Sequence, residues 1–164
     1  ICHRYASGNF GTVEAVSCDE SYMEVYAENA EIVCQLANDI RQDILKATQC
    51  TATIGVAANK LLAKLATDKV KPNSSYIASD YVELLQNLKL RDLHGIGYRS
   101  EPKLLENGLE TVQDVWNRGD EAENDLQTIL GKQTGTKIYN YCKGIDDRPV
   151  QPVERKTIGA EVRA

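Results

Sequence analysis

The hydrophobic and polar positions along the chain divide it into a mixed first half and a helical second half. Apolar residues recur at helical spacing over Asn29–Thr48, which predicts an amphipathic helix packed on one face. Thr12–Cys18 and Tyr22–Tyr26 have the pattern of strands on either side of a turn, like a short hairpin. Cys50–Val56 is predicted to be a buried strand and Asn59–Asp68 a short helix. Strands and helices alternate here, so this half is predicted to be an α+β or α/β layer.

From Ser79 onward the pattern becomes helical. Ser79 or Asp80 can cap a helix that continues to Leu88. A further helix is expected to end near Gly108, a natural residue for the position after a helix C-terminus. Two more helices are predicted around Val112–Asn117 and Lys132–Lys143, separated by segments containing Gly119 and Gly131.

Proline residues mark the end of this helical part. Pro149 and Pro152 interrupt the pattern as a linker would. We therefore expect an α+β fold in three parts: a mixed subdomain over residues 1–79, a small all-helical one over 80–150, and the start of a third element over 151–164.

Composition limits the classes of protein. The 164 residues include 42% hydrophobic residues, which is enough for a core and argues against global disorder. No apolar run approaches the roughly 18 residues of a membrane span, and no signal peptide opens the chain. The net charge of −5 argues against nonspecific nucleic-acid binding through bulk charge, but not against binding through a local patch or backbone amides. Because the chain starts at Ile1 without Met, we expect it to be an excerpt from a longer protein.

The cysteines indicate an intracellular protein. The five cysteines are an odd number and include no CxxC pair, so neither a disulfide framework nor a zinc site is predicted. Reduced thiols in an intracellular compartment fit this pattern best.

Two adjacent carboxylates, Asp19 and Glu20, interrupt the predicted hairpin. Acidic residues are depleted inside strands because desolvating a charge is costly. A sheet that places two acids together can neutralise them with a divalent metal, which prefers oxygen ligands. A solvent-exposed turn explains the same spacing, and the spacing by itself favours that explanation.

Lysines gather in the stretch from Asn59 to Ser74. Lys60 and Lys64 lie four residues apart on one face of the predicted helix, and Lys69 and Lys71 follow. Pro72 pushes Lys71 out of helical geometry. Ammonium groups beside a metal-binding acid pair would suit a polyphosphate ligand. The alternative is a solvated helix face, and no phosphate-binding loop of the GxxxxGK[ST] type is present.

The segment from Leu93 to Gly108 has the pattern of a helix-hairpin-helix. Gly95 and Gly97 flank Ile96, which lets the backbone turn tightly and approach a partner closely. The following helix, capped by Ser100, would direct free N–H groups outward, and such amides bind phosphate without a basic surface. An ordinary glycine-containing turn between helices is the alternative.

The remaining candidates for site chemistry carry no signal. His3 and His94 have no companion ligand at metal-binding spacing, so neither is assigned to a metal. No Ser/His/Asp or Cys/His arrangement is evident. Trp116 lies on an apolar helical face, which favours core packing.

Taken together, four motifs resemble the Y-family translesion DNA polymerases: SCDE, TIGVAANKLLAKLATDKVKPN, LHGIGYRSEPKLLENG and YCKGIDDRPV. The resemblance covers essentially the whole chain in the right order. Cys18 and the GIDDRPV run from Gly144 make it most similar to the eukaryotic deoxycytidyl transferase branch, which inserts dCMP opposite damaged or missing bases. The implied activity is translesion DNA synthesis, with binding of damaged DNA, and the implied location is the nucleus.

The resemblance implies a fold and roles for the motifs. Residues up to about Ser79 would be the second part of the palm, the helical part the thumb, and the rest the start of the linker to a little-finger domain. Asp19 and Glu20 match two metal-binding carboxylates, which implies a two-Mg²⁺ nucleotidyl transfer. Lys71 matches a lysine that contacts the incoming triphosphate, here dCTP. The other implied partner is primer–template DNA, whose backbone the thumb hairpin at Gly95, Ile96 and Gly97 would grip.

The sequence also departs from the family pattern. The first metal-binding carboxylate, in a DxD-type strand, and the fingers are absent from this sequence, so the chain by itself is expected to be inactive. Glu24 stands where many relatives have Asp. A noncatalytic helix-hairpin-helix module that binds DNA, or another Y-family branch, is therefore kept as an alternative, and a palm-like cyclase or dinucleotide synthase is ranked last.

Overall fold

The computed structural model describes residues 1–9 and 11–152, and the predicted third element at 153–164 lies outside the described residues. The sheet-containing half is made of α1 (Cys2–Asn9), β1 (Val13–Ala15), β2 (Ser21–Met23), α2 (Ala30–Thr48), β3 (Ile54–Val56), α3 (Lys60–Val70) and β4 (Ser75–Ile77). The helical half is made of α4 (Tyr81–Leu85), η1 (Leu90–Asp92), α5 (Glu101–Glu106), α6 (Val112–Asn117), η2 (Gly119–Glu121), α7 (Ala122–Leu130) and α8 (Lys132–Cys142). The α+β expectation is confirmed.

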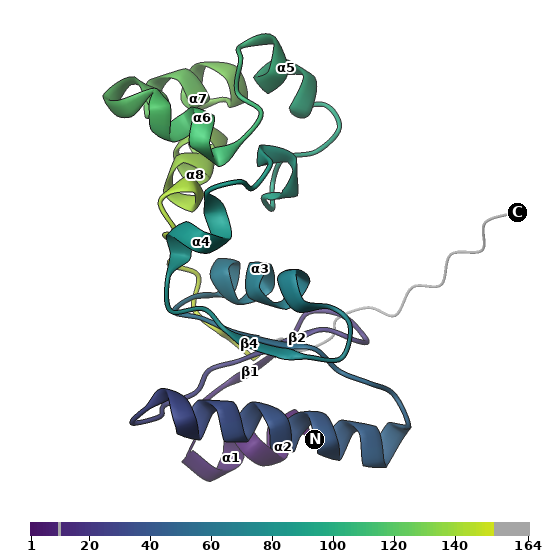
Figure 1. Cartoon of the computed structure of the whole chain (residues 1–164). Helices are drawn as coiled ribbons and strands as arrows, with labels where there is room; N and C mark the ends of the chain where they lie inside the picture. The colour runs from purple at the N-terminus through teal and green to yellow at the C-terminus, as the bar shows by residue number, and fades with distance from the viewer. Residues whose placement is uncertain (10, 153–164) are drawn as a thin grey trace, which may run out of the picture.

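The strands lie between two layers of helices. β1 pairs with β2 antiparallel, with Glu14 opposite Tyr22, which confirms the predicted hairpin. β3 pairs with β4 parallel, and α3 makes the crossover between them. Figure 1 shows α3 on one face of the strands and α1 and α2 on the other.

Close packing of α3 on β3 requires a glycine at Gly55. A Cβ atom at this position would lie 2.3 Å from the carbonyl oxygen of Ala63 and 2.3 Å from the backbone nitrogen of Thr67. Both atoms belong to the α3 backbone, so any larger residue would push the helix off the strand. This contact fixes the height of α3 above the strands.

Side-chain caps set the helix boundaries largely as the sequence predicts. Asn29 and Asn59 accept hydrogen bonds from the N–H groups of Ile32 and Leu62, and Asp80 accepts one from Val82. Gly108 follows the end of α5 with a φ of +71°, a conformation that favours glycine. Ser100 precedes α5 but makes no side-chain cap, contrary to expectation.

The helical half and α3 share one hydrophobic core. Leu61, Leu62 and Leu65 on the inner face of α3 pack into the same cluster as the buried residues of the helical half. The most completely buried members of that cluster include Leu85, Leu90, Leu93, Leu104, Leu109, Leu126 and Ile138. Trp116 packs against it, and its indole N–H donates to the carbonyl of Cys142 at 2.7 Å, as its apolar face predicts. Because the core is continuous, burial itself holds the helical half against α3.

The pattern did not reveal α1, β4 or α7. α7 lies between Gly119 and Gly131, where the sequence suggested only a glycine-containing connection. It packs tightly on α8 because Gly135 has no side chain: a Cβ there would lie 2.3 Å from the backbone nitrogen of Gln127. No helix among the described residues is long and apolar enough to cross a membrane. All five cysteines, which lie in the described ranges, are unpaired.

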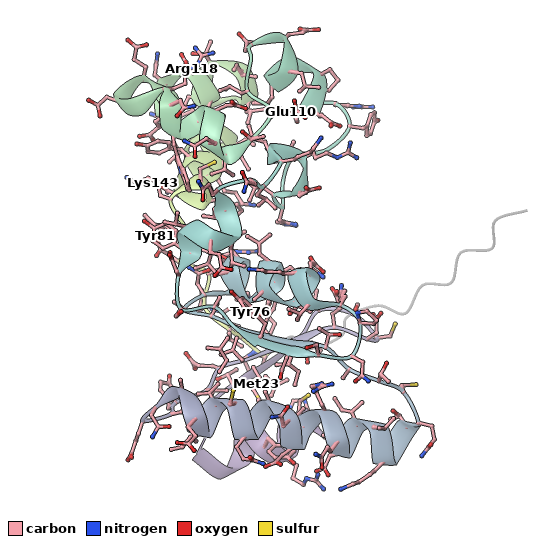
Figure 2. All side chains as sticks on the ribbon, viewed as in Figure 1. Met23, Tyr76, Tyr81, Glu110, Arg118 and Lys143 are labelled. Carbon is pink, nitrogen blue, oxygen red and sulfur yellow. The ribbon has the colours of Figure 1, made fainter. Side chains whose placement is uncertain are left out.

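The chain returns to the sheet-containing half after α8. We call residues 144–151 the return segment. Its hydrogen bonds to that half join Asn59 Nδ2 to the Gly144 carbonyl (2.8 Å), the Leu61 N–H to Asp146 Oδ2 (3.0 Å), Lys60 Nζ to the Pro149 carbonyl (3.0 Å) and the Gln151 N–H to Glu14 Oε2 (2.9 Å). Gly144 also sits against the ring of Tyr81, which Figure 2 labels where the two halves meet. The stretch that the prolines suggested to be a linker is thus bonded to the sheet-containing half.

Candidate functional site

The two acids predicted to bind metal lie in the tight loop between β1 and β2. The N–H groups of Val16 and Ser17 both donate to the carbonyl of Glu20, at 2.9 and 3.1 Å, and this closes the loop. The Ser17 hydroxyl donates to Asp19 Oδ1 at 2.6 Å and accepts a bond from the N–H of Glu20 at 3.1 Å. The backbone therefore presents Asp19 and Glu20 side by side, and both residues are exposed.

Asp19 is held in its charged form. The Ser17 hydroxyl, the backbone N–H of Asp19 and the Cys18 thiol all donate toward its carboxylate and lower its pKa below the usual value. An ionised carboxylate is a hard oxygen ligand of the kind that Mg²⁺ prefers. Asp19 is thus chemically suited to the predicted metal-binding role.

Glu20 is linked to α3 through Lys64. Lys64 Nζ contacts Glu20 Oε1 and lies 3.7 Å from Asp68 Oδ1, one turn further along α3. The hydrogen bond from Lys64 to Glu20 raises the pKa of the lysine. Asp68 Oδ1 in turn lies 2.6 Å from Nζ of Lys71. We call Glu20, Lys64, Asp68 and Lys71 the acid–lysine row.

The acid–lysine row brings together residues that the sequence only suggested as neighbours. It runs from the hairpin loop along the exposed edge of α3 to Lys71, so the metal-binding candidates and the triphosphate-binding candidate share one surface. Opposite charges alternate along the row, so each of its ammonium groups lies beside a carboxylate.

A cavity of about 430 Å³ lies next to the row, between α3, α4 and η1. Its lining residues are Leu65, Asp68, Lys69, Glu83, Leu84, Leu88 and Asp92. Asp68 belongs to the row, and Asp92 lies three residues before Gly95. The surface beside the row is therefore hollowed where α3 meets the start of the helical half.

The lysine cluster divides into three environments. Lys64 and Lys71 belong to the acid–lysine row. Lys69 pairs with Glu83 of α4 at 2.6 Å and also contacts the hydroxyl of Tyr76. Lys60 is buried, with 7% of its surface exposed, so the solvated-face alternative is wrong for this residue.

The predicted helix-hairpin-helix turn is present between η1 and α5. Gly95 and Gly97 are exposed, and Gly95 has a φ of +112°. Ile96 is buried in the core, and its N–H donates to the Leu93 carbonyl at 3.1 Å, so this residue anchors the turn. Among the described residues, the N–H groups of Gly95 and Gly97 have no protein acceptor.

The amides after the turn differ from the expectation. The N–H groups of Ser100 and Glu101 both donate to the carbonyl of Gly97, at 2.9 and 3.1 Å, instead of pointing outward. These bonds close the turn on itself, and the Ser100 side chain supplies no cap. Ser100 and Glu101 therefore offer no N–H group to a phosphate, whereas those of Gly95 and Gly97 stay open.

Sequence reasoning missed three residues beside this turn. Tyr98 is 78% exposed, and its hydroxyl accepts a hydrogen bond from Nε of Arg99 at 2.8 Å. Lys137 of α8 approaches Gly95, since its Nζ would lie 3.7 Å from a Cβ there. The neighbourhood of Lys137 and burial also lower the pKa of His94, with burial the larger cause. The turn thus carries local positive charge on an acidic chain.

The acid pair supplies only part of a metal site. Within residues 1–9 and 11–152 no group of three or more His, Cys, Asp or Glu side chains could hold a metal ion. Asp19 and Glu20 fit Mg²⁺ by the chemistry of their oxygen donors, and a complete ligand set needs a carboxylate from outside this surface. The resemblance implies the same, because the first carboxylate of the family belongs to a strand that this sequence does not contain.

Two family models match the chain. The impB/mucB/samB family model matches residues 2–68, and the model of the DNA polymerase-iota thumb domain matches residues 91–146. Between them they cover most of α3, the helix-hairpin-helix turn and the β1–β2 hairpin with Asp19 and Glu20, which we call the carboxylate hairpin.

Curated relatives come from different branches. DNA repair protein Rev1 of Drosophila melanogaster is 36% identical over 157 residues, which are 92% of this chain and 16% of the fly protein. DNA polymerase IV of Francisella tularensis subsp. holarctica is 36% identical over 159 residues, 91% of this chain and 43% of that protein. The chain therefore spans less than half the length of these relatives, and overall identity does not separate their branches.

Solved structures agree with the family models. The Y-family DNA polymerase chimera Dbh-Dpo4(243-245)-Dbh superposes with a TM-score of 0.79 at 29% identity, over 94% of this chain and 46% of the chimera. The insertion ternary complex of Dbh DNA polymerase gives a TM-score of 0.77 at 29% identity, over 92% of this chain and 44% of that chain. The fold, the order of the motifs and these similarities lead to one conclusion: the chain belongs to the Y-family DNA polymerases and contains palm and thumb sequence of that family.

Proposed function

We propose that the protein carrying this chain is a translesion DNA polymerase of the deoxycytidyl transferase branch. It adds dCMP from dCTP to a primer 3′ end opposite damaged or abasic template. The observation that carries the proposal is the acid–lysine row, which links Glu20 beside Asp19 to Lys71 on one exposed surface.

In this proposal the row provides positioning and charge. Asp19 and Glu20 hold Mg²⁺ together with the first carboxylate of the family, and the bound ions supply activation of the primer hydroxyl and charge neutralisation at the leaving pyrophosphate. Lys71, and Lys64 one helical turn from Asp68, offer ammonium groups to the triphosphate oxygens. The exposed glycines at Gly95 and Gly97 contact the DNA backbone without reading its sequence.

The assignment of the acids is tested in the full-length protein with Asp19→Ala and Glu20→Ala. Each variant should lose primer extension while it still binds primer–template DNA, because neither residue lies in the DNA-binding turn. Asp120→Ala is the control, since Asp120 is an exposed acid on η2 in the helical half. Unchanged extension rates in both variants would refute metal binding by this pair.

The choice of dCTP is the finer part of the proposal. It rests on the resemblance of Cys18 and of the GIDDRPV run, whereas the equal identity to a polymerase IV favours the alternative of another Y-family branch. Single-nucleotide incorporation opposite an abasic site separates the two. A preference for dCTP supports the transferase, and no preference, or a preference for another nucleotide, supports the other branch.

A noncatalytic DNA-binding module is the second candidate. It is favoured by the open N–H groups of Gly95 and Gly97, which need no catalytic acid. Under this alternative the full-length protein binds duplex DNA in a salt-dependent way but extends no primer.

We also propose that the protein acts in the nucleus. This location follows from the eukaryotic deoxycytidyl transferase branch and is independent of the site geometry. Imaging of the fluorescently tagged full-length protein tests it, and exclusion from the nucleus would contradict it.

A further inference from the structure

We propose that Lys60 is a positioning residue that fixes the carboxylate hairpin against α3, acting through Glu14. The inference rests on the proposed function, because it concerns where Asp19 and Glu20 are held.

Lys60 uses its whole ammonium group inside the protein. Its Nζ lies 2.8 Å from Oε1 and 2.6 Å from Oε2 of Glu14, and it donates to the carbonyl of Pro149 at 3.0 Å. A lysine has three N–H donors, so these partners satisfy all of them. Any movement of this buried ammonium group would leave a donor without its acceptor, so the group is held in one position.

Both strands of the hairpin meet this ammonium group. Glu14 lies on β1, and its register partner on β2 is Tyr22. The ring centroid of Tyr22 lies 5.2 Å from Lys60 Nζ, within the range of a cation–π contact. Lys60 therefore holds the hairpin at a cross-strand pair and not at one strand alone.

Among the described residues, two ion pairs connect the hairpin to α3, and they differ in strength. Lys60 and Lys64 lie one turn apart on α3 and pair with Glu14 and Glu20 respectively. The side chains of the Lys64–Glu20 pair are 38% and 46% exposed, whereas those of the Lys60–Glu14 pair are 8% and 16% exposed. Exposed pairs are weak and screened by salt, while loss of one partner of a buried pair is costly. The Lys60–Glu14 pair therefore sets the position, and Glu20 follows it.

The return segment also binds to the Lys60–Glu14 pair. Glu14 Oε2 also accepts the N–H of Gln151 at 2.9 Å. Burial works to raise the pKa of Glu14, but the hydrogen bonds from Lys60 and from Gln151 lower it overall, so the carboxylate stays charged. The hairpin, α3 and the segment leaving the helical half thus meet at one ion pair.

The test uses the full-length protein with Lys60→Met, which keeps the length of the side chain and removes its charge, and with Lys60→Arg. Amide hydrogen exchange is measured at Val16 and Ser17, whose N–H groups close the hairpin loop. In steady-state extension, kcat and the KM for dCTP are measured separately. Lys89→Met is the control, because Lys89 forms an exposed pair with Glu110 on the helical half.

Lys60→Met should speed exchange at Val16 and Ser17 and lower kcat by about 100-fold, the loss that a misplacement of about 1 Å can cause. The KM for dCTP should change little, because Lys71 is held by α3 and not by the hairpin. Lys60→Arg should restore part of kcat, and Lys89→Met should change neither measurement. Protection of the α6 and α8 amides shows whether the variant is folded.

If Lys60→Met does not fold, the double variant Lys60→Met/Glu14→Gln is measured in its place, because it removes both buried charges. Full kcat in a folded variant, or unchanged exchange at Val16 and Ser17, would overturn the proposal. The exchange readout needs no catalysis. If the Asp19→Ala and Glu20→Ala variants are active, the proposed function is refuted. The positioning of the hairpin by Lys60 is then still tested, by hydrogen exchange alone.

Discussion

Lys71 Nζ lies 2.6 Å from Oδ1 of Asp68, three residues earlier at the end of α3. The side chains of the two residues are about half exposed, at 49% and 46%. Asp68 therefore occupies the ammonium group that the proposed function assigns to the triphosphate, and a nucleotide has to displace it.

Replacing Asp68 with Asn should strengthen nucleotide binding. An exposed ion pair is worth roughly 0.2–1 kcal/mol, so its removal should lower the KM for dCTP by up to about fivefold. Steady-state extension by the full-length protein measures the change. Asp125→Asn, which removes an exposed pair with Arg118 on the helical half, should have no effect. A rise in KM would show instead that Asp68 aligns Lys71 for the nucleotide.

Ser17→Ala should raise the pKa of Asp19 toward its ordinary value. The Ser17 hydroxyl is the largest cause of the lowered pKa. A carboxylate with a lowered pKa keeps its charge until the pH falls through that value, so the variant should lose the charge at a higher pH than the wild type. A carboxyl NMR titration measures this directly, and the acidic limb of the extension profile should move the same way. Ser21→Ala, outside the loop, should leave the titration as it is.

Gly97→Ala should weaken DNA binding without unfolding the protein. No atom lies within 4 Å of the position a Cβ would take, so the fold has room for it. The methyl group would stand where the DNA backbone approaches, and the loss of one hydrogen bond to a charged group costs roughly 1.5–3 kcal/mol, or about tenfold or more in affinity. Titration with duplex DNA tests this. Ser100→Ala, which removes no cap, is the control, and unchanged affinity in Gly97→Ala would argue against a role of this turn.

Arg41→Lys should loosen the turn that follows Lys71. Nη2 of Arg41 contacts both the carbonyl and the side-chain oxygen of Asn73, at 2.5 and 2.8 Å, and its Nε donates to the carbonyl of Ala52 at 3.0 Å. Asn73 has a φ of +54°, so this anchoring holds it in a costly conformation. A lysine cannot reproduce the planar fork, and the free energy of unfolding should fall by about 1–3 kcal/mol in chemical denaturation. Arg91→Lys, at an exposed pair with Glu101, should change it far less.

Local patterns were sufficient to predict the hairpin, the cap at Asp80 and most helices. The acids at Asp19 and Glu20 break an alternating pattern, Asn59 and Asp80 precede apolar runs, and Gly108 follows one; each signal acts over a few residues. The pattern did not predict β4 because this strand has only three residues and its partner, β3, lies on the other side of α3 in the sequence. The pattern did not predict α7 because Gly119 and Gly131 lie close to its two ends, and glycines are typical of connections between helices.

The environment of Lys60 shows why the rest could not be predicted. In the sequence Lys60 and Lys64 have the same helical spacing and nearly the same neighbours. What separates them is contact with Glu14, 46 residues away, and with Pro149, 89 residues away. Whether a lysine on one helix is buried or exposed depends on where distant segments cross it, and residue spacing carries no record of that crossing.

The return segment makes the helical half an excursion from the sheet-containing half, with one crossing at Ser79 and Asp80 and another near Gly144. If the helical half is replaced by the thumb of a relative, both junctions with the sheet-containing half have to fit. The second junction includes Asp146, whose carboxylate accepts the N–H of Leu61 at the start of α3. A graft that cuts between Cys142 and Gly144 keeps the native return segment with α3, whereas one that cuts after Gln151 replaces it with the return segment of the relative. Chimeras of this family are therefore best divided just ahead of Gly144.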